Sequence, residues 1–395
     1  MMKKEEKLWN EGYIKVMTAN FALYFAFYLL MPLLPLYLSE NFNATKDVIG
    51  LVLSGYTLTS LLSRPFSGYL VDSFPRKKVF MWCFFLFFIF FAGYLGAVSL
   101  LMFTIVRTLH GVPFGALTVS ASTVAIDVLP SSRRNEGIGF YGLANNIAMA
   151  IAPSVAIFVY KATNSFYILF WISLLVALLG LILASTIRIP QRETVINKSK
   201  LSLDRFFLLR GWLLAVNMVF FGFCYGVLSS YLAIYSKEKM GITTGTGTYF
   251  TLLSLGLILS RLQGNKGLKK GRLTQNATQG VIVSSVGYFL FVAFPNPVGY
   301  YLSAFLIGLG NGHMYPAFQN MFIAVAHHNE RGTANSSILV AWDIGVGIGV
   351  VLGGIVAEGL GYTPAFWMVS MAQIIGAILF LVATRQFFNK RKIER

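Results

Sequence analysis

Charged residues are scarce in this chain. Only 12% of its 395 residues are Asp, Glu, Lys or Arg, and 56% are hydrophobic. A soluble domain carries roughly 25% charged residues, which keep its surface compatible with water. A chain this apolar could not cover its surface in the same way, so we infer an integral membrane protein. The composition excludes a soluble enzyme and a disordered chain.

Cysteine is nearly absent as well. The two cysteines, Cys83 and Cys224, lie within apolar runs and imply no disulfide framework. The sequence also lacks a phosphate-binding loop for ATP and the H-E-x-x-H pattern of zinc enzymes. We therefore expect no enzymatic activity, no cofactor and no metal site.

Acidic residues are few, at 15 against 32 Lys and Arg, which gives a formal net charge of +17. In a soluble protein this excess would indicate a nucleic-acid partner. Here the basic residues fall between apolar runs, as they do in membrane proteins. We expect the lipid bilayer, and no nucleic acid, to be the partner of this charge.

Long apolar runs are abundant. A membrane helix needs about 20 mostly apolar residues to cross the hydrocarbon layer. Twelve runs meet this requirement and predict an all-α integral membrane protein. The predicted spans are residues 16–38, 47–70, 79–97, 99–128, 137–160, 164–187, 211–235, 246–264, 274–294, 297–326, 333–357 and 363–384.

Lys and Arg gather on one side of the predicted membrane, the side of the two termini. The loops of the opposite side hold only four of the 32 basic residues, Lys46, Lys161, Lys237 and Lys239. Loops rich in Lys and Arg stay in the cytoplasm. We therefore predict a multi-pass protein of the cell membrane with both termini cytoplasmic.

The longest polar connection divides the spans into two sets of six. At a constant offset, Leu62-Ser63-Arg64 of the first set repeats as Leu259-Ser260-Arg261 of the second set. Transporters are commonly built from such repeats around a central site. The predicted parts are an N-terminal six-helix half, a cytoplasmic linker and a C-terminal six-helix half, at residues 1–187, 188–210 and 211–395.

The loop after the second span carries the most informative motif. Residues 68–78 read GYLVDSFPRKK. This resembles the motif G-x-L-x-D-R-x-G-R-[KR] of the major facilitator superfamily, which implies twelve spans in two halves. Arg76 can pair with the Asp72 carboxylate, and Asp127 at the end of the fourth span is a further partner. In the family this cluster latches the two halves together on the cytoplasmic side, whereas the corresponding second-half loop here has lost the Asp.

The fourth span contains Arg107 and His110 within RTLHGVPFGA. This resembles the family motif R-x-x-Q-G-x-x-x-A, whose Arg is linked to proton transfer. An Arg this deep in a membrane helix should face water or a partner. The alternative is an Arg held by helix carbonyls for architecture alone. His110 could titrate near neutral pH or serve only as a hydrogen-bonding group.

The fifth span carries a softened form of an export signature. The antiporter branch of the superfamily has G-x8-G-x3-G-P-x2-G, and this chain has Gly139, Ala148, Ala152-Pro153 and Ala156. Small residues are retained, so close helix packing is possible. The pattern favours efflux, and a generic packing face is the alternative.

Asp343 is the one acidic residue, of 15, that lies well inside a predicted span. A carboxylate within the membrane is a functional candidate by default. We regard Asp343 as the candidate proton carrier. A structural ion pair or hydrogen bond is the competing interpretation.

Polar and aromatic side chains within the spans are candidates for the substrate cavity, because they would be wasted facing lipid. Asn20, Tyr24 and Tyr28 recur every four residues and could form one lining stripe. The other candidates are Asn145, Asn146, Asn217, Tyr225, Gln319, Asn320, Trp342 and Gln373.

The resemblance implies a secondary active transporter, and we expect proton-coupled efflux of a small amphiphilic molecule, in the manner of multidrug antiporters. An uptake symporter or a sugar or metabolite carrier is the alternative. The expected partners are the small-molecule substrate and protons, and a monomer is sufficient for this architecture.

Overall fold

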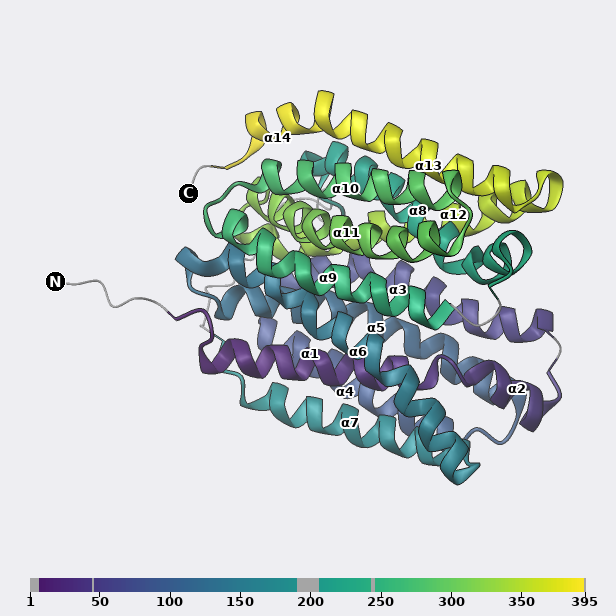
Figure 1. The fold of residues 1–395 in the computed structure, drawn as a ribbon. Coiled ribbons are helices and arrows are strands. Elements are labelled where there is room, and N and C mark those ends of the chain that lie inside the picture. Colours follow the sequence, from purple (N-terminus) through teal and green to yellow (C-terminus); the bar gives the residue numbers. More distant parts are fainter. Residues whose placement is uncertain (1–6, 45, 190–205, 243–245, 394–395) are drawn as a thin grey trace. The chain divides into compact units, whose positions relative to one another are not determined.

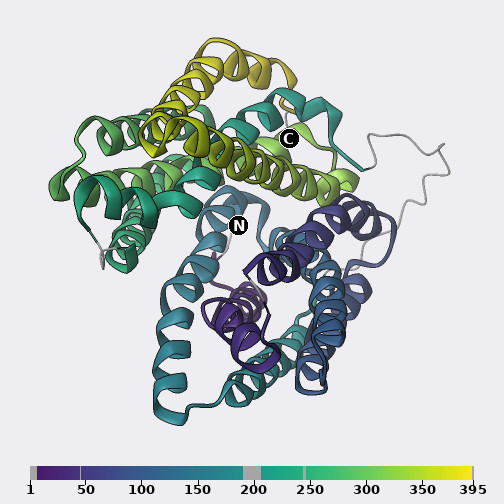
Figure 2. The ribbon, with the colours of Figure 1, turned by 90° about the vertical axis from the view of Figure 1, so that its right-hand side faces the viewer.

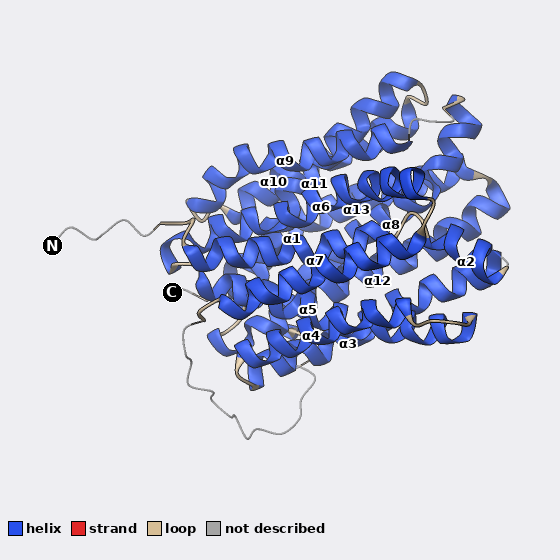
Figure 3. Ribbon diagram, turned by 90° about the horizontal axis from the view of Figure 1, so that it is seen from below, coloured by secondary structure: helices blue, strands red, loops and turns tan. Residues whose placement is uncertain are grey.

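The computed structural model describes residues 7–44, 46–189, 206–242 and 246–393. These residues form helices and loops, and no strand occurs among them (Figure 3). The helices of the first predicted half are α1 (Glu11–Leu30), α2 (Leu34–Phe42), α3 (Lys46–Ser73), α4 (Arg76–Leu95), α5 (Leu100–Val128), α6 (Arg134–Thr163) and α7 (Phe166–Thr186) (Figure 1). Those of the second are α8 (Trp212–Met240), α9 (Thr246–Lys269), α10 (Leu273–Ala293), α11 (Pro297–Val325), α12 (Arg331–Leu360), α13 (Tyr362–Leu379) and α14 (Arg385–Arg391).

Each of the twelve predicted spans contains a long helix, which confirms the all-α membrane fold. Within the described part of the chain, nine helices are long and apolar enough to cross a membrane. The other three long helices, α3, α9 and α11, have their apolar stretches interrupted by polar residues and glycines. Such polar helices suit positions shielded by other helices rather than positions facing lipid.

The first predicted span, residues 16–38, is wrong in one respect, because it is not a single helix. α1 ends at Leu30 and α2 begins at Leu34, with a turn over residues 31–33. Pro32 has no N–H to donate, and its ring obstructs the preceding turn of a helix. Pro35 then stands in the first turn of α2, where proline is tolerated. The last span is longer than predicted, since a π-helical turn at Phe380–Thr384 joins α13 to α14.

The described residues fall into two compact units. Unit 1 comprises the described residues within Met1–Gly137, Tyr141–Phe207 and Asn329–Ser336, and unit 2 comprises the other described residues. The first turns of α12 therefore belong to unit 1, and Ile138–Phe140 of α6 belong to unit 2. Most of the predicted linker lies outside the described residues, so the boundaries of the two halves stay a prediction.

Within unit 1, helices α3 and α5 pack closely along each other, and α1 packs against α7. Gly111 and Gly115 of α5 face the backbone of Tyr56 and Ser60 of α3, where a Cβ atom would not fit. In Figure 2 the purple to blue helices of this unit gather into one bundle. The small residues allow the two backbones to approach.

Within unit 2, α9 and α11 pack in the corresponding way. Gly308 and Gly312 of α11 face Leu253 and Ser260 of α9. The same glycine-mediated contact thus recurs between the second and fourth long helices of each set, as a duplicated six-helix unit requires.

Candidate functional site

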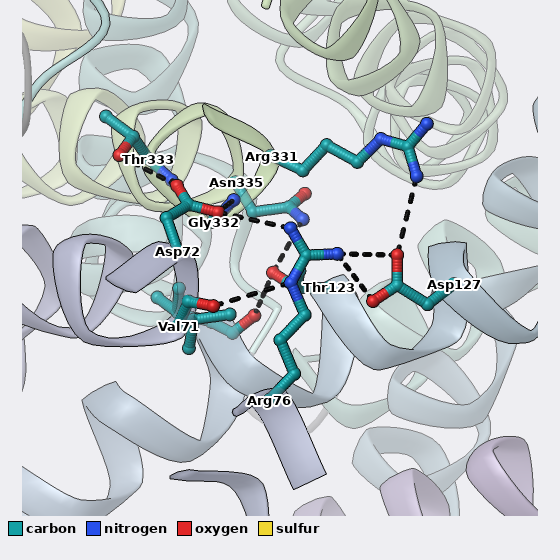
Figure 4. A network of polar contacts seen from close by, with 10 residues as sticks. Val71, Asp72, Arg76, Thr123, Asp127, Arg331, Gly332, Thr333 and Asn335 are labelled. Atoms are coloured by element: carbon teal, nitrogen blue, oxygen red, sulfur yellow. Dashed lines mark hydrogen bonds and ion pairs between the residues drawn. The ribbon is translucent and has the colours of Figure 1, made fainter. Parts of the chain in front are cut away.

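Four charged side chains meet where α3, α4 and α5 end or begin (Figure 4). Arg76, the first residue of α4, donates from Nη1 to both carboxylate oxygens of Asp127, at 2.6 and 2.5 Å. Its Nη2 donates to Oδ1 of Asp72 at 3.2 Å, and its Nε donates to the carbonyl of Val71. The structure therefore brings together Asp72 and Arg76 of the motif and Asp127, the further partner predicted at the end of the fourth span.

Asp72 also caps the beginning of α12. Its carboxylate accepts hydrogen bonds from the backbone N–H groups of Gly332 at 2.9 Å and Thr333 at 2.8 Å, and from the Thr333 hydroxyl at 3.0 Å. The first N–H groups of a helix lack partners within the helix and attract negative charge. Arg331 adds a contact from its Nη1 to Oδ1 of Asp127 at 3.4 Å. We call Asp72, Arg76, Asp127 and Arg331 the charged cluster.

The charged cluster is buried and formally neutral. The exposed fractions of its side chains are 10% for Asp72, 6% for Arg76, 12% for Asp127 and 4% for Arg331. Two carboxylates balance two guanidinium groups. Removing one member of a buried ion pair costs about 3–5 kcal/mol, because its partner stays buried and uncompensated.

Close packing accompanies these contacts. A Cβ atom at Gly68 would lie 2.8 Å from Cβ of Ser336 and 3.0 Å from Cα of Thr333, so only glycine fits there. The Ser336 hydroxyl donates to the carbonyl of Arg64 at 2.7 Å, and the Asn335 amide donates to the Thr123 hydroxyl at 3.1 Å. The first two turns of α12 are thus fixed to α3 and α5.

The sequence did not indicate the role of Arg331, Gly332 and Thr333. The available signal was the similarity of Glu330-Arg331-Gly332 to Asn135-Glu136-Gly137 at the start of the corresponding helix. That similarity marks an equivalent position in the repeat, but it does not say which carboxylate caps it.

Arg107 lies in a second site within unit 1. The residue is buried, with an exposed fraction of 2%. Nη1 donates to the Tyr94 hydroxyl at 3.2 Å, Nη2 donates to the Met31 sulfur at 3.4 Å, and Cζ lies 4.0 Å from the centre of the Tyr56 ring. No carboxylate of the described residues lies within ion-pair distance. These contacts are made with side chains and not with helix carbonyls.

His110 is held by the same tyrosine, with 2.9 Å between its Nδ1 and the Tyr94 hydroxyl. Because that hydroxyl accepts from Arg107, its single hydrogen is available for donation to Nδ1 of His110. The ring packs against Phe87, Phe90 and Phe91. We call Arg107, its contacts Met31, Tyr56 and Tyr94, and the neighbouring His110 the Arg107 box.

The predicted cavity residues of unit 1 occupy several places. Tyr24 and Tyr28 stack at 6.1 Å between ring centres, and Phe114 of α5 lies edge-on to Tyr24. The side-chain oxygen of Asn20 accepts from the Tyr141 hydroxyl at 2.9 Å. Asn145 is half-buried and Asn146 is buried, both on α6.

Those of unit 2 separate into an aromatic group and buried amides. The Trp342 ring lies 5.5 Å from Tyr225 and 5.6 Å from Tyr315. Asn217 donates to the Gly376 carbonyl of α13, and Asn320 donates to the Pro316 carbonyl within α11. These two amides contribute to helix packing. The remaining predicted positions are half-buried Gln319 on α11 and buried Gln373 on α13.

Asp343 is half-buried on α12, beyond the turns that contact Asp72. It belongs to unit 2, whereas Arg107 and His110 belong to unit 1. The described residues include no group of three or more His, Cys, Asp or Glu side chains that could hold a metal ion.

A sequence profile described as the Major Facilitator Superfamily matches residues 16–349 and 271–395. The chain is 24% identical over 363 residues to the staphylopine export protein of Staphylococcus aureus (strain Mu50), which covers 89% of each chain.

Among solved structures, the fold is similar to that of FucP, the fucose:proton symporter of Escherichia coli, in its outward conformation. The TM-score is 0.79 and the identity 17%, over 98% of this chain and all of FucP. The human organic anion transporter MFSD10 gives a TM-score of 0.78 at 15% identity, over 93% of this chain and 98% of that one.

Proposed function

The chain belongs to the major facilitator superfamily, and on that premise we propose that it is a proton-coupled exporter of a small amphiphilic molecule that works by alternating access. The family and the helices establish a multi-pass membrane transporter. The direction of transport, the coupling ion and the cytoplasmic location of both termini belong to the proposal.

The observation that carries the proposal is the charged cluster at the start of α12. One helix begins in unit 1, capped by Asp72, and continues from Ser337 in unit 2. Movement of α12 away from α3 would break the hydrogen bonds from Gly332 and Thr333 to Asp72. It would also break the contact between Arg331 and Asp127. Buried contacts of this kind are either formed or broken, so α12 has two discrete positions rather than a continuous range of positions. Alternating access requires two such states.

Proton coupling is assigned to Asp343, which shares α12 with the charged cluster. It lies about 15 Å along the helix axis from Thr333, at 1.5 Å per residue. Gaining or losing a proton there changes the charge on the same helix whose first turn Asp72 holds. Protonation and substrate would then favour opposite arrangements of α12.

Export is favoured by two observations. The relative with 24% identity is a staphylopine exporter that matches over 89% of both chains. Ala148, Ala152 and Ala156 of α6 are fully buried, so the small residues of the antiporter pattern are in packing positions. The aromatic groups around Tyr24 and Trp342 offer flat apolar faces that suit an amphiphilic substrate.

The experiment is proton release from inverted membrane vesicles on addition of a panel of dyes and metabolites. The proposal predicts release with at least one compound, and loss of release in Asp343→Asn. The matched control is Glu358→Gln, because Glu358 is an exposed acid on the same helix. Release that persists in Asp343→Asn would remove Asp343 from the coupling path.

An uptake symporter or metabolite carrier is the second candidate. It stays open because the antiporter glycines are replaced by Ala148, Ala152 and Ala156, which weakens the export pattern. Inverted vesicles distinguish the two, since a symporter moves the proton and the compound in the same direction and an exporter of the proposed type moves them oppositely.

A further inference from the structure

Most of the hydrogen-bonding capacity of Arg107 is unused. A guanidinium group has five N–H donors. Among the described residues its acceptors are the Tyr94 hydroxyl and the Met31 sulfur, and Nε has no acceptor. Neither acceptor is charged. The residue is 2% exposed, so bulk solvent reaches little of the guanidinium group.

Two aromatic rings lie near the guanidinium group. Tyr56 lies 4.0 Å and Phe27 6.0 Å from Cζ, and Phe27 in turn stacks on Phe114 at 4.6 Å. The faces of aromatic rings attract a cation but leave its charge in place. The Arg107 box is therefore a site with one positive charge, spare donors and apolar walls.

We infer that the Arg107 box binds the carboxylate of a small organic anion with an apolar body. This identifies the substrate class and rests on the proposed function, because it makes the site part of the transported molecule's path. The planar guanidinium fork matches a carboxylate in geometry, with two parallel N–H···O bonds. A single negative charge fits, since Arg107 carries the one permanent positive charge in the box.

The Met31 sulfur marks the side from which the anion arrives. Met31 lies in the break between α1 and α2 and is 41% exposed, whereas Arg107 is buried directly behind it. A thioether is a weak acceptor, so a carboxylate oxygen would displace it readily.

The test measures binding to the full-length protein in lipid nanodiscs at one pH, without a gradient. The probe is phenylacetate, and phenylacetamide is its uncharged counterpart of nearly the same shape. We expect calorimetric binding of phenylacetate, and at least about tenfold weaker binding of the amide, because the amide lacks the charge of the ion pair. Equal affinities for the two compounds would overturn the inference.

Variants locate the site. Arg107→Gln should abolish phenylacetate binding, and Arg107→Lys should weaken it by about tenfold, because an ammonium group cannot form the bidentate contact. Arg261→Gln is the matched control, because Arg261 is a buried arginine of α9 in unit 2. Unchanged phenylacetate binding in folded Arg107→Gln would overturn the inference.

Met31→Leu keeps the inference testable if Arg107→Gln does not fold. Leucine removes the competing sulfur at nearly constant volume, so phenylacetate should bind at least as tightly as to the wild type. Loss of binding in Met31→Leu would contradict the displacement of the sulfur and overturn the inference.

The two proposals fail in different ways. Phenylacetate binding that depends on Arg107, without proton release in vesicles, supports the carboxylate site and contradicts proton-coupled export. Proton release with uncharged or cationic compounds, without carboxylate binding, supports export and contradicts the site.

Discussion

At the end of α3, carboxylates and guanidinium groups hold the first turns of α12, whereas at the end of α9 the side chains next to Gly139 of α6 are uncharged. In unit 1, Gly68 makes room for Thr333 and Ser336, and Asp72 caps the helix. In unit 2, the side chains of Asn265 and Leu268 face Gly139 of α6.

The glycine of the close contact has therefore moved to the opposite helix. We call the contact between α3 and α12 the first corner and the contact between α9 and α6 the second corner. The glycine lies on α3 in the first corner and on α6 in the second, so both corners retain a close approach of two helices. The charge has not been retained, because the repeat places exposed Lys269 at the position of Asp72. Close packing is thus retained in both copies of the duplicated fold, whereas the electrostatic contact is present in one.

The largest effect is expected for Arg76→Ala. It leaves the carboxylates of Asp72 and Asp127 buried with one guanidinium group fewer, at a cost of about 3–5 kcal/mol. The measurement is the unfolding free energy in mixed micelles. Arg272→Ala is the control, since Arg272 is an exposed residue at the start of α10. Equal losses in both variants would contradict the asymmetry between the corners.

Asp72→Asn should release the first turn of α12. The amide keeps an acceptor for one of the N–H groups but loses the charge, and a hydrogen bond to a charged group contributes about 1.5–3 kcal/mol. Hydrogen exchange at Gly332 and Thr333 should accelerate at least about tenfold, at 1.4 kcal/mol per factor of ten. Unchanged exchange at these two amides would exclude Asp72 as the cap.

Gly68→Ala should destabilise more than Gly139→Ala. The new methyl group at position 68 meets the backbone of Gly332 and Thr333, which cannot move without shifting α12. At position 139 it meets the side chains of Asn265 and Leu268, which can change rotamer. Overpacking costs about 1–3 kcal/mol, and we place position 68 near the upper end. Thermal unfolding of the two variants side by side would check the order.

The smallest effect is expected for Glu136→Gln. Glu136 pairs with Arg133 three residues away at 2.7 Å, with 14% and 22% of the side chains exposed. A partly exposed local pair contributes about 0.2–1 kcal/mol. This charge at the start of α6 therefore does not replace the charged cluster. A loss as large as that of Arg76→Ala would show that the α6 corner is electrostatic after all.

The sequence predicted the twelve spans, because apolar runs are local signals, and the pairing of Asp72 with Arg76, because both lie in one contiguous motif. Asp127 was predicted as a further partner from its position at the end of the fourth span. It missed the break at Met31–Leu33, where Pro32 outweighs an uninterrupted apolar run. It also missed the cap on Gly332 and Thr333 and the contact of Arg107 with Tyr94. These join segments distant in the chain, and no spacing or period in the sequence encodes which backbone N–H or phenol a charged side chain will reach.

The most direct test of the account is to lock the first turns of α12 to α5. The Asn335 amide nitrogen and the Thr123 hydroxyl are 3.1 Å apart, so cysteines at these two positions can be joined by a short bifunctional thiol reagent that a reductant cleaves. The background is a protein with Cys83 and Cys224 replaced by Ser. We expect the cross-link to abolish transport in vesicles and the reductant to restore it. Full transport with the cross-link formed would contradict the release of α12 as a step in the transport cycle.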